Sequence, residues 1–262
     1  MSDCCPAPNR ESIYDLAVIG AGSAGFSAAI AAAEQGARVA LIGHGQIGGT
    51  CVNVGCVPSK TMIRAAEALH GAREASRFDG IAGEARLVDW RRVIAAKDEL
   101  VAGLREKKYI ELLPQYEGIA YIEGKACLAD GGVAVGDSFI RAPKIVIATG
   151  GRPSAPPIPG LDEVNYLTST SLLELDALPK SLIVVGGGFI GAELAQMMAR
   201  MGVAVSLVCR SRLLPQAEPE VSDALMGVFQ GEGMRLHCGV AYDACRQDAA
   251  SVTLCVKEDG AV

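Results

Sequence analysis

Two glycine-rich segments, each placed between a short apolar run and a helix-forming stretch, constrain the fold of this chain most. Residues 13–19 lead into the first segment, GAGSAG at 20–25, and residues 181–185 lead into the second, GGGFIG at 186–191. Each pattern predicts a buried parallel strand that turns sharply into a helix, as at the start of a βαβ unit. Gly36 and Gly202 then end the two helices, and a further strand is expected after each.

This arrangement is typical of dinucleotide binding. The first glycine permits the tight turn, the second lets a pyrophosphate approach the backbone, and the third lets the helix pack against the strand. The helix N-terminus adds unpaired N–H groups and the positive end of the helix dipole. The candidate nucleotide contacts are Gly20, Gly22, Ser23, Ala24 and Gly25 in the first unit, and Gly186, Gly188, Phe189, Ile190 and Gly191 in the second.

The two units predict an α/β protein with two Rossmann-like domains, at residues 13–178 and 179–262, after a flexible arm at 1–12. Half of the 262 residues are hydrophobic and 21% are charged, which suits a folded chain with a sizeable core. The net charge of −6 argues against nucleic acid or an anionic membrane as a partner. Because no apolar run approaches the ~20 residues of a membrane helix, and residues 1–10 do not resemble a signal peptide, we expect a cytoplasmic protein.

The chain contains nine cysteines, and their spacing matters more than their number. Cys51 and Cys56 lie in the block GGTCVNVGCVPSK at 48–60, at the mouth of a predicted helix. A helix N-terminus and the nearby Lys60 would both favour thiolate, the form that attacks disulfides and binds soft metals. The spacing alone is equally compatible with a buried structural pair. Five scattered cysteines are interpreted as small, mostly buried hydrophobic residues: Cys127, Cys209, Cys238, Cys245 and Cys255.

The block at 48–60, following a dinucleotide fingerprint, resembles the redox-active segment of the class I pyridine nucleotide–disulfide oxidoreductases. This family includes glutathione reductase, dihydrolipoamide dehydrogenase and mercuric reductase, and the resemblance extends from about Tyr14 to the end of the chain. It implies a three-layer FAD-binding domain followed by a nicotinamide-binding domain. Further FAD contacts are then expected at Gly49, Thr50, Lys60, Thr149 and Gly150.

The resemblance also assigns roles to the catalytic candidates. Cys51 and Cys56 would form the disulfide that is reduced through the flavin. Cys56 would face the flavin as the charge-transfer thiolate, and Cys51 would be the interchange thiol that meets the substrate. Lys60 would lie at the N5 edge of the flavin, paired with Glu193.

Three stretches are similar to the mercuric reductase branch of the family: residues 61–67, 78–81, and 104–109 together with 123–126. They imply reduction of Hg(II) to Hg(0), with Cys51 and Cys56 as ligands of the metal substrate. One alternative is another member of the family, a disulfide reductase or dihydrolipoamide dehydrogenase. A second is a non-catalytic fragment that at most binds nucleotide or mercury. The family resemblance further implies a homodimer.

The choice of nicotinamide cofactor can be argued from the end of the second strand of each unit. An acid there binds the ribose hydroxyls of NAD, whereas arginines accommodate the 2′-phosphate of NADP. The second unit has Arg210 and Arg212 and no acid, which favours NADPH, unless both arginines merely face solvent. The first unit has Gly43 and His44 where an acid for the FAD ribose is expected, so FAD affinity could suffer.

Two features concern the ends of the chain. Members of the family normally continue beyond this point, so the nicotinamide-binding domain is expected to be incomplete and the activity of the chain by itself is uncertain. Near the start, Cys4 and Cys5 form a vicinal pair that could hand Hg(II) to the active site, since two thiolates suit a soft metal. An incidental pair on a mobile tail is the alternative.

Overall fold

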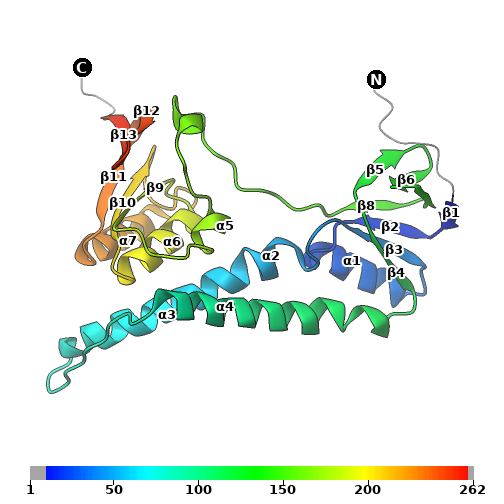
Figure 1. The fold of residues 1–262 in the computed structure, drawn as a ribbon, viewed down its shortest axis with the longest axis horizontal. Helices are drawn as coiled ribbons and strands as arrows, with labels where there is room; N and C mark the ends of the chain where they lie inside the picture. Colours follow the sequence, from blue (N-terminus) through cyan, green and yellow to red (C-terminus); the bar gives the residue numbers. More distant parts are fainter. Residues whose placement is uncertain (1–9, 259–262) are drawn as a thin grey trace. The chain divides into compact units, whose positions relative to one another are not determined.

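A computed structural model describes residues 10–258, whose contacts divide the chain into two compact units (Figure 1). The first unit consists of the chain up to Pro58 together with Asp98–Arg152. The second consists of Ser59–Lys97 together with the chain from Pro153 onward. The boundary expected between residues 178 and 179 stays a prediction. Within residues 10–258, no helix combines the length and the apolar character needed to cross a membrane.

A four-stranded parallel sheet lies at the centre of the first unit. Its order is β4-β3-β2-β8, and every neighbouring pair is parallel. The strands are β2 (Leu16–Ile19), β3 (Val39–Gly43), β4 (Ile119–Glu123) and β8 (Ile145–Ile147). Helix α1 (Ser23–Ala33) connects β2 to β3, so the first predicted βαβ unit is present.

Both faces of this sheet are covered, because successive side chains of a strand point to opposite faces. Val18, Val39 and Leu41 pack with Phe26 and Ala29 of α1. Their neighbours Ala17, Ala40 and Ile42 pack instead with Val133, Val135 and Ile140 of a second sheet. The three layers expected for this domain are therefore confirmed.

The second sheet has the order β1-β7-β6-β5. Its strands are β1 (Arg10–Ile13), β5 (Ala126–Ala129), β6 (Gly132–Val135) and β7 (Ser138–Arg141). Strands β5 to β7 form an antiparallel meander, and β1 pairs in parallel with β7. Residues 10–12 were expected to belong to a flexible arm, and this is wrong, because their backbone pairs with residues 138–140. The rest of the arm lies outside the described residues.

Helices link the two units along the chain. Helix α2 (Gly49–Asn53) precedes α3 (Cys56–Arg73), which begins in the first unit and continues into the second. Helix α4 (Trp90–Arg105) begins in the second unit and ends in the first. Short helical turns follow these helices: η1 (Glu74–Arg77), η2 (Glu106–Ile110) and η3 (Leu113–Gln115).

The second unit contains a three-stranded parallel sheet of order β11-β10-β9. Its strands are β9 (Ser181–Val185), β10 (Ala204–Cys209) and β11 (Arg235–Cys238), and a hairpin of β12 (Val240–Gln247) and β13 (Val252–Glu258) follows. The helical segments are η4 (Leu161–Glu163), α5 (Ser169–Leu172), α6 (Phe189–Arg200) and α7 (Pro219–Gly231). Together with the first unit, this sheet confirms the α/β class.

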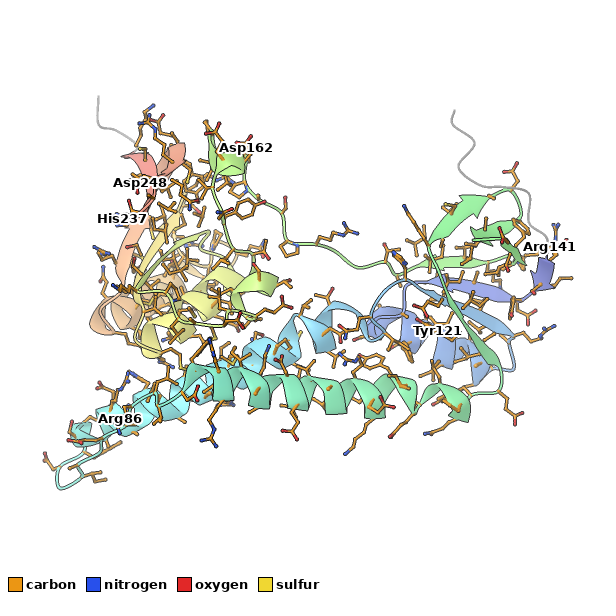
Figure 2. All side chains as sticks on the ribbon, in the orientation of Figure 1. Arg86, Tyr121, Arg141, Asp162, His237 and Asp248 are labelled. Atoms are coloured by element: carbon orange, nitrogen blue, oxygen red, sulfur yellow. The ribbon has the colours of Figure 1, made fainter. Side chains whose placement is uncertain are left out.

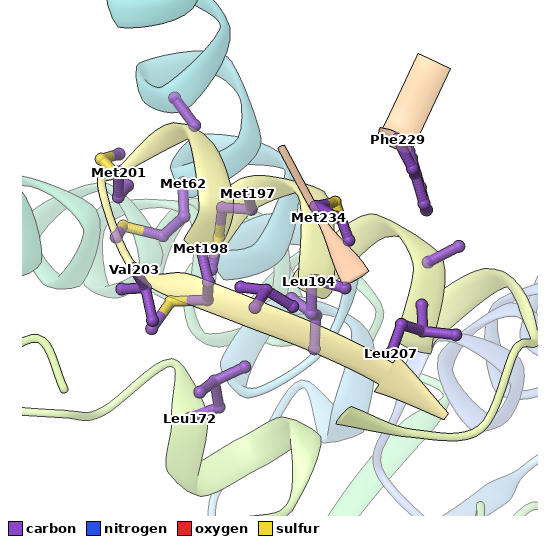
Figure 3. Close-up of a cluster of buried hydrophobic side chains, with 14 of the residues drawn as sticks. Met62, Leu172, Leu194, Met197, Met198, Met201, Val203, Leu207, Phe229 and Met234 are labelled. Carbon is purple, nitrogen blue, oxygen red and sulfur yellow. The ribbon is translucent and has the colours of Figure 1, made fainter. Parts of the chain in front are cut away.

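The core of the second unit is rich in methionine (Figure 3). Met197 and Met198 of α6 pack with Met62 of α3, Leu207 of β10 and Phe229 of α7, and each of the five is at most 2% exposed. Segments from residues 59–97 and from residues 153–262 thus share one core. Two polar anchors add to this packing. Trp90 Nε1 donates to the carbonyl of Leu175 at 2.7 Å, and the buried Lys97 Nζ donates to that of Leu173 at 3.0 Å.

Candidate functional site

The first glycine turn has the strained geometry that its sequence predicts. Gly20 has φ = +119°, and a Cβ at this position would lie 2.1 Å from the carbonyl oxygen of Ala148. A Cβ at Gly25 would lie 1.7 Å from the carbonyl oxygen of Gly20. Neither space admits a side chain, so the two glycines bring α1 against the carboxyl end of β2.

Three segments predicted to bind FAD converge at this turn. The backbone of Gly22 forms a parallel bridge with Gly48, and a Cβ at Gly49 would lie 2.6 Å from Gly22 Cα. The segment after β8 also reaches this place, because a Cβ at Gly150 would lie 3.9 Å from Thr50 Oγ1. The structure therefore brings together candidates from residues 20–25, 49–50 and 149–150.

The N-terminus of α1 fits an anionic ligand such as the diphosphate of FAD. Its cap residue Gly22 provides no side-chain hydrogen bond, and the first turn contains no acidic residue. The first N–H groups of the helix thus keep their capacity to bind phosphate, and the helix dipole favours negative charge there. Ser23 Oγ lies 3.0 Å from the hydroxyl of Tyr109, whose ring packs edge-on against Phe26.

Tyr121, labelled in Figure 2, lies beside Gly43, the position at which an acidic residue for the FAD ribose was expected. A Cβ at Gly43 would lie 2.5 Å from the Tyr121 hydroxyl and 2.9 Å from Ala21 Cβ. Burial, and secondarily the charge of Glu123, raises the pKa of this hydroxyl, so it stays protonated and can donate a hydrogen bond. His44 is exposed, in agreement with its interpretation as a loop residue.

The cysteine pair lies at the junction of α2 and α3. Cys51 is within α2 and Cys56 is the first residue of α3. Gly55 permits the tight connection, because a Cβ there would lie 2.9 Å from the carbonyl oxygen of Thr50. Asn53 fixes the loop by donating from Nδ2 to the carbonyls of Ile47 and Gly49, both at 2.9 Å.

The Asn53 side chain is itself held by Arg105, a residue that the sequence argument missed. Arg105 Nη1 donates to Asn53 Oδ1 at 2.9 Å from the end of α4. Asn53 lies within the redox block at 48–60, so its place in the sequence is a signal for a role in positioning the cysteines. Arg105 is 52 positions away, and only the folded chain reveals the contact.

Cys51 and Cys56 are present as thiols that interact directly. A hydrogen bond between their side chains, followed by burial, raises the pKa of the Cys51 thiol. Cys51 is half-buried and Cys56 is exposed. The pair can act as a dithiol, which either closes to a disulfide or binds a soft metal.

Lys60 and Glu193 form an ion pair in the second unit, as the family resemblance implies. Lys60 lies one turn into the α3 helix after Cys56, and Glu193 lies on α6. Their side chains are 56% and 44% exposed, so both remain accessible to a ligand. Their roles toward a flavin stay predictions.

The second glycine turn repeats the geometry of the first. Gly186 has φ = +115°, and a Cβ at Gly191 would lie 2.1 Å from the carbonyl oxygen of Gly186. Gly188 caps α6 without a side-chain hydrogen bond, and a Cβ there would meet open space. Phe189 and Ile190, which follow it, are 59% and 64% exposed. These features fit the diphosphate of a second dinucleotide.

A cleft of about 650 Å³ opens beside this turn. Its lining includes Gly186, Gly187, Arg210, Arg212 and Tyr242. The two arginines differ in their availability. Arg212 Nη2 donates to the carbonyl of Ala217 at 2.6 Å and is therefore engaged, whereas Arg210 is exposed. Arg210 is the better candidate for a ribose phosphate.

The remaining metal candidates, Cys4 and Cys5, lie outside the described residues. Within residues 10–258 there is no cluster of three or more His, Cys, Asp or Glu side chains that could hold a metal ion. A soft metal bound between Cys51 and Cys56 would have the two thiolates of this pair as ligands.

The described residues thus combine two glycine turns of the dinucleotide-binding type with a pair of cysteine thiols that contact each other. The chain matches the family described as pyridine nucleotide-disulphide oxidoreductase over residues 14–262, and it belongs to this family. It is 46% identical to mercuric reductase from Streptomyces lividans, over 91% of this chain and 52% of that protein. It is 43% identical to mercuric reductase from Staphylococcus aureus, over 96% and 46% respectively. The predicted resemblance to this branch is confirmed.

A solved structure gives a further likeness. The HOCl-induced flavoprotein disulfide reductase RclA from Escherichia coli superimposes with a TM-score of 0.79 at 30% identity, over 95% of this chain and 54% of that one. The chain thus spans about half the length of the relatives that it matches.

Proposed function

We propose that this chain is the cofactor- and dithiol-bearing part of an enzyme that reduces Hg(II) to Hg(0) with electrons from NADPH. The observation that carries the proposal is the hydrogen-bonded pair of Cys51 and Cys56 next to the converged glycine segments. The identity with mercuric reductases over about nine tenths of the chain supports the choice of metal substrate.

FAD, when bound at the first glycine turn, would supply two electrons drawn from the nicotinamide. The cysteine pair of the chain would receive these electrons and bind the metal ion. Cys51 and Cys56 accept two electrons when their disulfide opens, and the two thiols each lose a proton as they bind Hg(II). A second pair of electrons, which the bound cofactors would supply, reduces the bound ion to Hg(0) and leaves both cysteines as thiolates, each able to take up a proton again. A soft ion is well matched to two sulfur ligands.

Positioning residues keep this dithiol in place. Asn53 ties the loop to Ile47 and Gly49, and Arg105 holds Asn53. NADPH is the proposed nicotinamide cofactor, because Arg210 is exposed beside the second turn and could pair with a 2′-phosphate. A homodimer in the cytoplasm is the proposed state of the whole enzyme.

Reduction of an organic disulfide is the second candidate function. The likeness to the E. coli disulfide reductase favours it, since the same pair of thiols could exchange with a substrate disulfide. Cys51 would then attack the substrate and Cys56 would resolve the mixed disulfide. The two functions differ in the final acceptor and use the same thiols.

The first test is the visible absorption spectrum of the purified chain with FAD, before and after anaerobic addition of NADPH. We expect a flavin spectrum that gains a long-wavelength band from a thiolate beside the flavin. NADPH oxidation is then followed with Hg(II) or with an organic disulfide as the acceptor. Faster oxidation with Hg(II) supports mercury reduction, and faster oxidation with the disulfide supports the second candidate.

Two variants serve as a matched pair. Replacing Cys51 and Cys56 together by serine should abolish both the band and the turnover. Cys127→Ser changes a half-buried cysteine on β5 of the same unit and should leave both intact. A chain that binds FAD and NADPH without turnover would instead support a non-catalytic binding fragment.

A further inference from the structure

A second pair of cysteines lies at the carboxyl ends of two neighbouring strands in the second unit. Cys209 ends β10 and Cys238 ends β11, and the two residues are register partners in the parallel ladder. Their sulfur atoms are 3.3 Å apart. These cysteines, interpreted from the sequence as scattered hydrophobic residues, therefore form a dithiol that has no part in the proposed reduction of Hg(II).

The backbone geometry permits a bond between these sulfurs. Adjacent strands lie about 4.8 Å apart, and disulfides span Cα separations of about 4.4–6.8 Å. Closing the gap to a disulfide length of about 2.0 Å requires the sulfurs to approach by little more than an ångström. A metal held linearly between them, with bonds of about 2.3 Å, would instead force them roughly 4.6 Å apart.

The packing around Cys209 opposes such an opening. Cys209 is 2% exposed, and a Cβ at Gly187 would lie 3.0 Å from its sulfur. Leu213, which is fully buried, packs in the same core. Cys238 is half-buried whereas Cys209 is buried, so Cys238 is the more accessible residue of the pair and the one expected to meet a small reagent first. Closure of the pair is favoured over metal binding on these grounds.

We propose that Cys209 and Cys238 form a second redox-active dithiol, which closes to a disulfide in exchange with small organic disulfides. The Cys238 sulfur attacks one sulfur of the reagent and expels the first thiol. The Cys209 sulfur then loses its proton, attacks Cys238 and expels the second thiol. Two S–S bonds are exchanged in sequence, two electrons pass to the reagent, and the two protons end on the released thiols.

Burial, followed by the hydrogen bond with Cys238, raises the pKa of the Cys209 thiol to about 12. Cys209 is thus poorly suited to the first attack, whereas its sulfur lies 3.3 Å from that of Cys238 and is placed for the second, intramolecular one. Because its thiolate is scarce at neutral pH, closure should become faster as the pH rises.

The location of the pair suggests what its oxidation would change. Cys209 leads directly into Arg210, and the carbonyl of Ser211 accepts a hydrogen bond from the Gly239 amide at 3.3 Å. The carbonyl of Gly187 in the glycine turn accepts one from Leu214 at 2.6 Å. A bond between the two strand ends would pull on this loop, which lines the cleft. This consequence rests on the proposed dinucleotide site, whereas the disulfide itself does not.

The test exposes the native chain, with Cys51 and Cys56 replaced by serine, to oxidised glutathione. After quenching with acid and alkylation of the remaining thiols, proteolysis and mass spectrometry identify linked peptides. We expect a peptide pair joined through Cys209 and Cys238, lighter by two hydrogens than the separate peptides and lost on reduction. Its yield should increase with pH over the range in which circular dichroism shows the native fold.

Matched variants decide between the possible results. Cys255→Ser removes another half-buried cysteine of the same unit and should leave the linked pair unchanged. Cys238→Ser should leave Cys209 unmodified. The proposal would be overturned if the parent chain of this test, with serine at 51 and 56 and all other cysteines present, carried only a stable glutathione adduct on Cys238 or linked Cys209 to another cysteine.

A second measurement addresses the consequence for the cleft. The affinity for NADPH is compared between the oxidised and the reduced chain by fluorescence titration, and we expect the oxidised chain to bind more weakly. If the linked peptides form but the affinity for NADPH is unchanged, the redox-active dithiol stands and its proposed effect on the cleft is wrong. If NADPH binds to neither the oxidised nor the reduced chain, the result counts against the proposed function. The mass-spectrometric search for the linked Cys209 and Cys238 peptides still tests the dithiol by itself.

Discussion

Lys60 on α3 donates a hydrogen bond from Nζ to Glu193 Oε2 on α6, across 133 positions of sequence. Both side chains are about half exposed. Ion pairs of this kind contribute only about 0–1 kcal/mol to stability. The pair is thus poorly explained as a structural brace, and the place of Lys60 at the end of the redox block at 48–60 favours a role toward a ligand.

We therefore predict that Lys60→Met alters flavin reduction far more than stability. The melting temperature should change little, while the absorption change on anaerobic NADPH addition becomes slower or smaller. Arg64→Met is the control, because Arg64 forms an ion pair with Glu67 on the same helix, with side chains 79% and 52% exposed. If both variants reduce the flavin alike, the assignment of Lys60 is wrong.

The raised pKa of Cys51 leads to a second prediction. Its largest cause is the hydrogen bond with Cys56, followed by burial. Cys56→Ala removes the first cause, so the pKa of Cys51 should fall towards its usual range. Thiolate then forms at lower pH, and alkylation of Cys51 by iodoacetamide at pH 7 should become faster.

Mass spectrometry of the Cys51 peptide measures this rate as a function of pH. Cys127→Ala, which replaces a cysteine on strand β5, away from the α2 helix that contains Cys51, should leave the Cys51 profile unchanged. A profile that is the same with and without Cys56 would mean that burial alone controls the thiol.

Local patterns in the sequence were sufficient for the two glycine turns. Gly25 and Gly191 meet the carbonyls of Gly20 and Gly186, five residues earlier in the chain, and Gly20 and Gly186 themselves have positive φ, as a strand that turns sharply into a helix requires. The same holds for the placement of Cys56 at a helix start. Such features depend on short-range geometry that the order of residues encodes directly.

Contacts between distant segments could not be predicted in this way. Tyr121 fills the space beside Gly43, and Cys209 meets Cys238, because neighbouring strands of a sheet come from different parts of the chain. Strand order and register decide both contacts. The sequence shows that position 43 is not acidic and that the chain contains scattered cysteines. Only the order and register of the strands show that Tyr121 lies beside Gly43 and that Cys238 lies beside Cys209.

The packing of Tyr121 against Gly43 leads to a third prediction. Gly43→Glu would restore the acid expected for the FAD ribose, yet its Cβ would clash with the Tyr121 hydroxyl at 2.5 Å. We expect a loss of about 1–3 kcal/mol in stability, typical of overpacking. Combining it with Tyr121→Ala should remove the clash with the tyrosine ring, which leaves the approach of 2.9 Å to Ala21 Cβ, and should raise FAD affinity above that of Tyr121→Ala alone.

Thermal unfolding by circular dichroism and FAD titration measure the two effects. His44→Glu places the same acid one residue later, at an exposed position, and should change stability little. Additive effects of the two substitutions at 43 and 121 would contradict the direct contact.

Glu232 provides the last prediction, on the response of the second unit to acid. Arg200 donates to this carboxylate at 2.8 Å from Nε and at 2.6 Å from Nη2, and Gln196 donates at 2.8 Å. Burial opposes the charge, but the Arg200 hydrogen bonds and charge outweigh it and lower the pKa of Glu232. Since the pKa is lower in the folded state, the charged pair stabilises at pH above the usual carboxyl range of about 4.3 and stops doing so as the pH falls through the folded value.

Glu232→Gln should thus lower the free energy of unfolding by about 1–3 kcal/mol at pH 7, and the difference from the wild type should vanish in acid. Fluorescence of Trp90, the single tryptophan of the chain, reports urea unfolding of this unit, because its indole donates to the Leu175 carbonyl there. Glu174→Gln, at an exposed carboxylate of the same unit, is the control and should show no such pH dependence. A difference between Glu232→Gln and the wild type that stayed constant down to acid pH would show that the side chain acts through its shape rather than its charge.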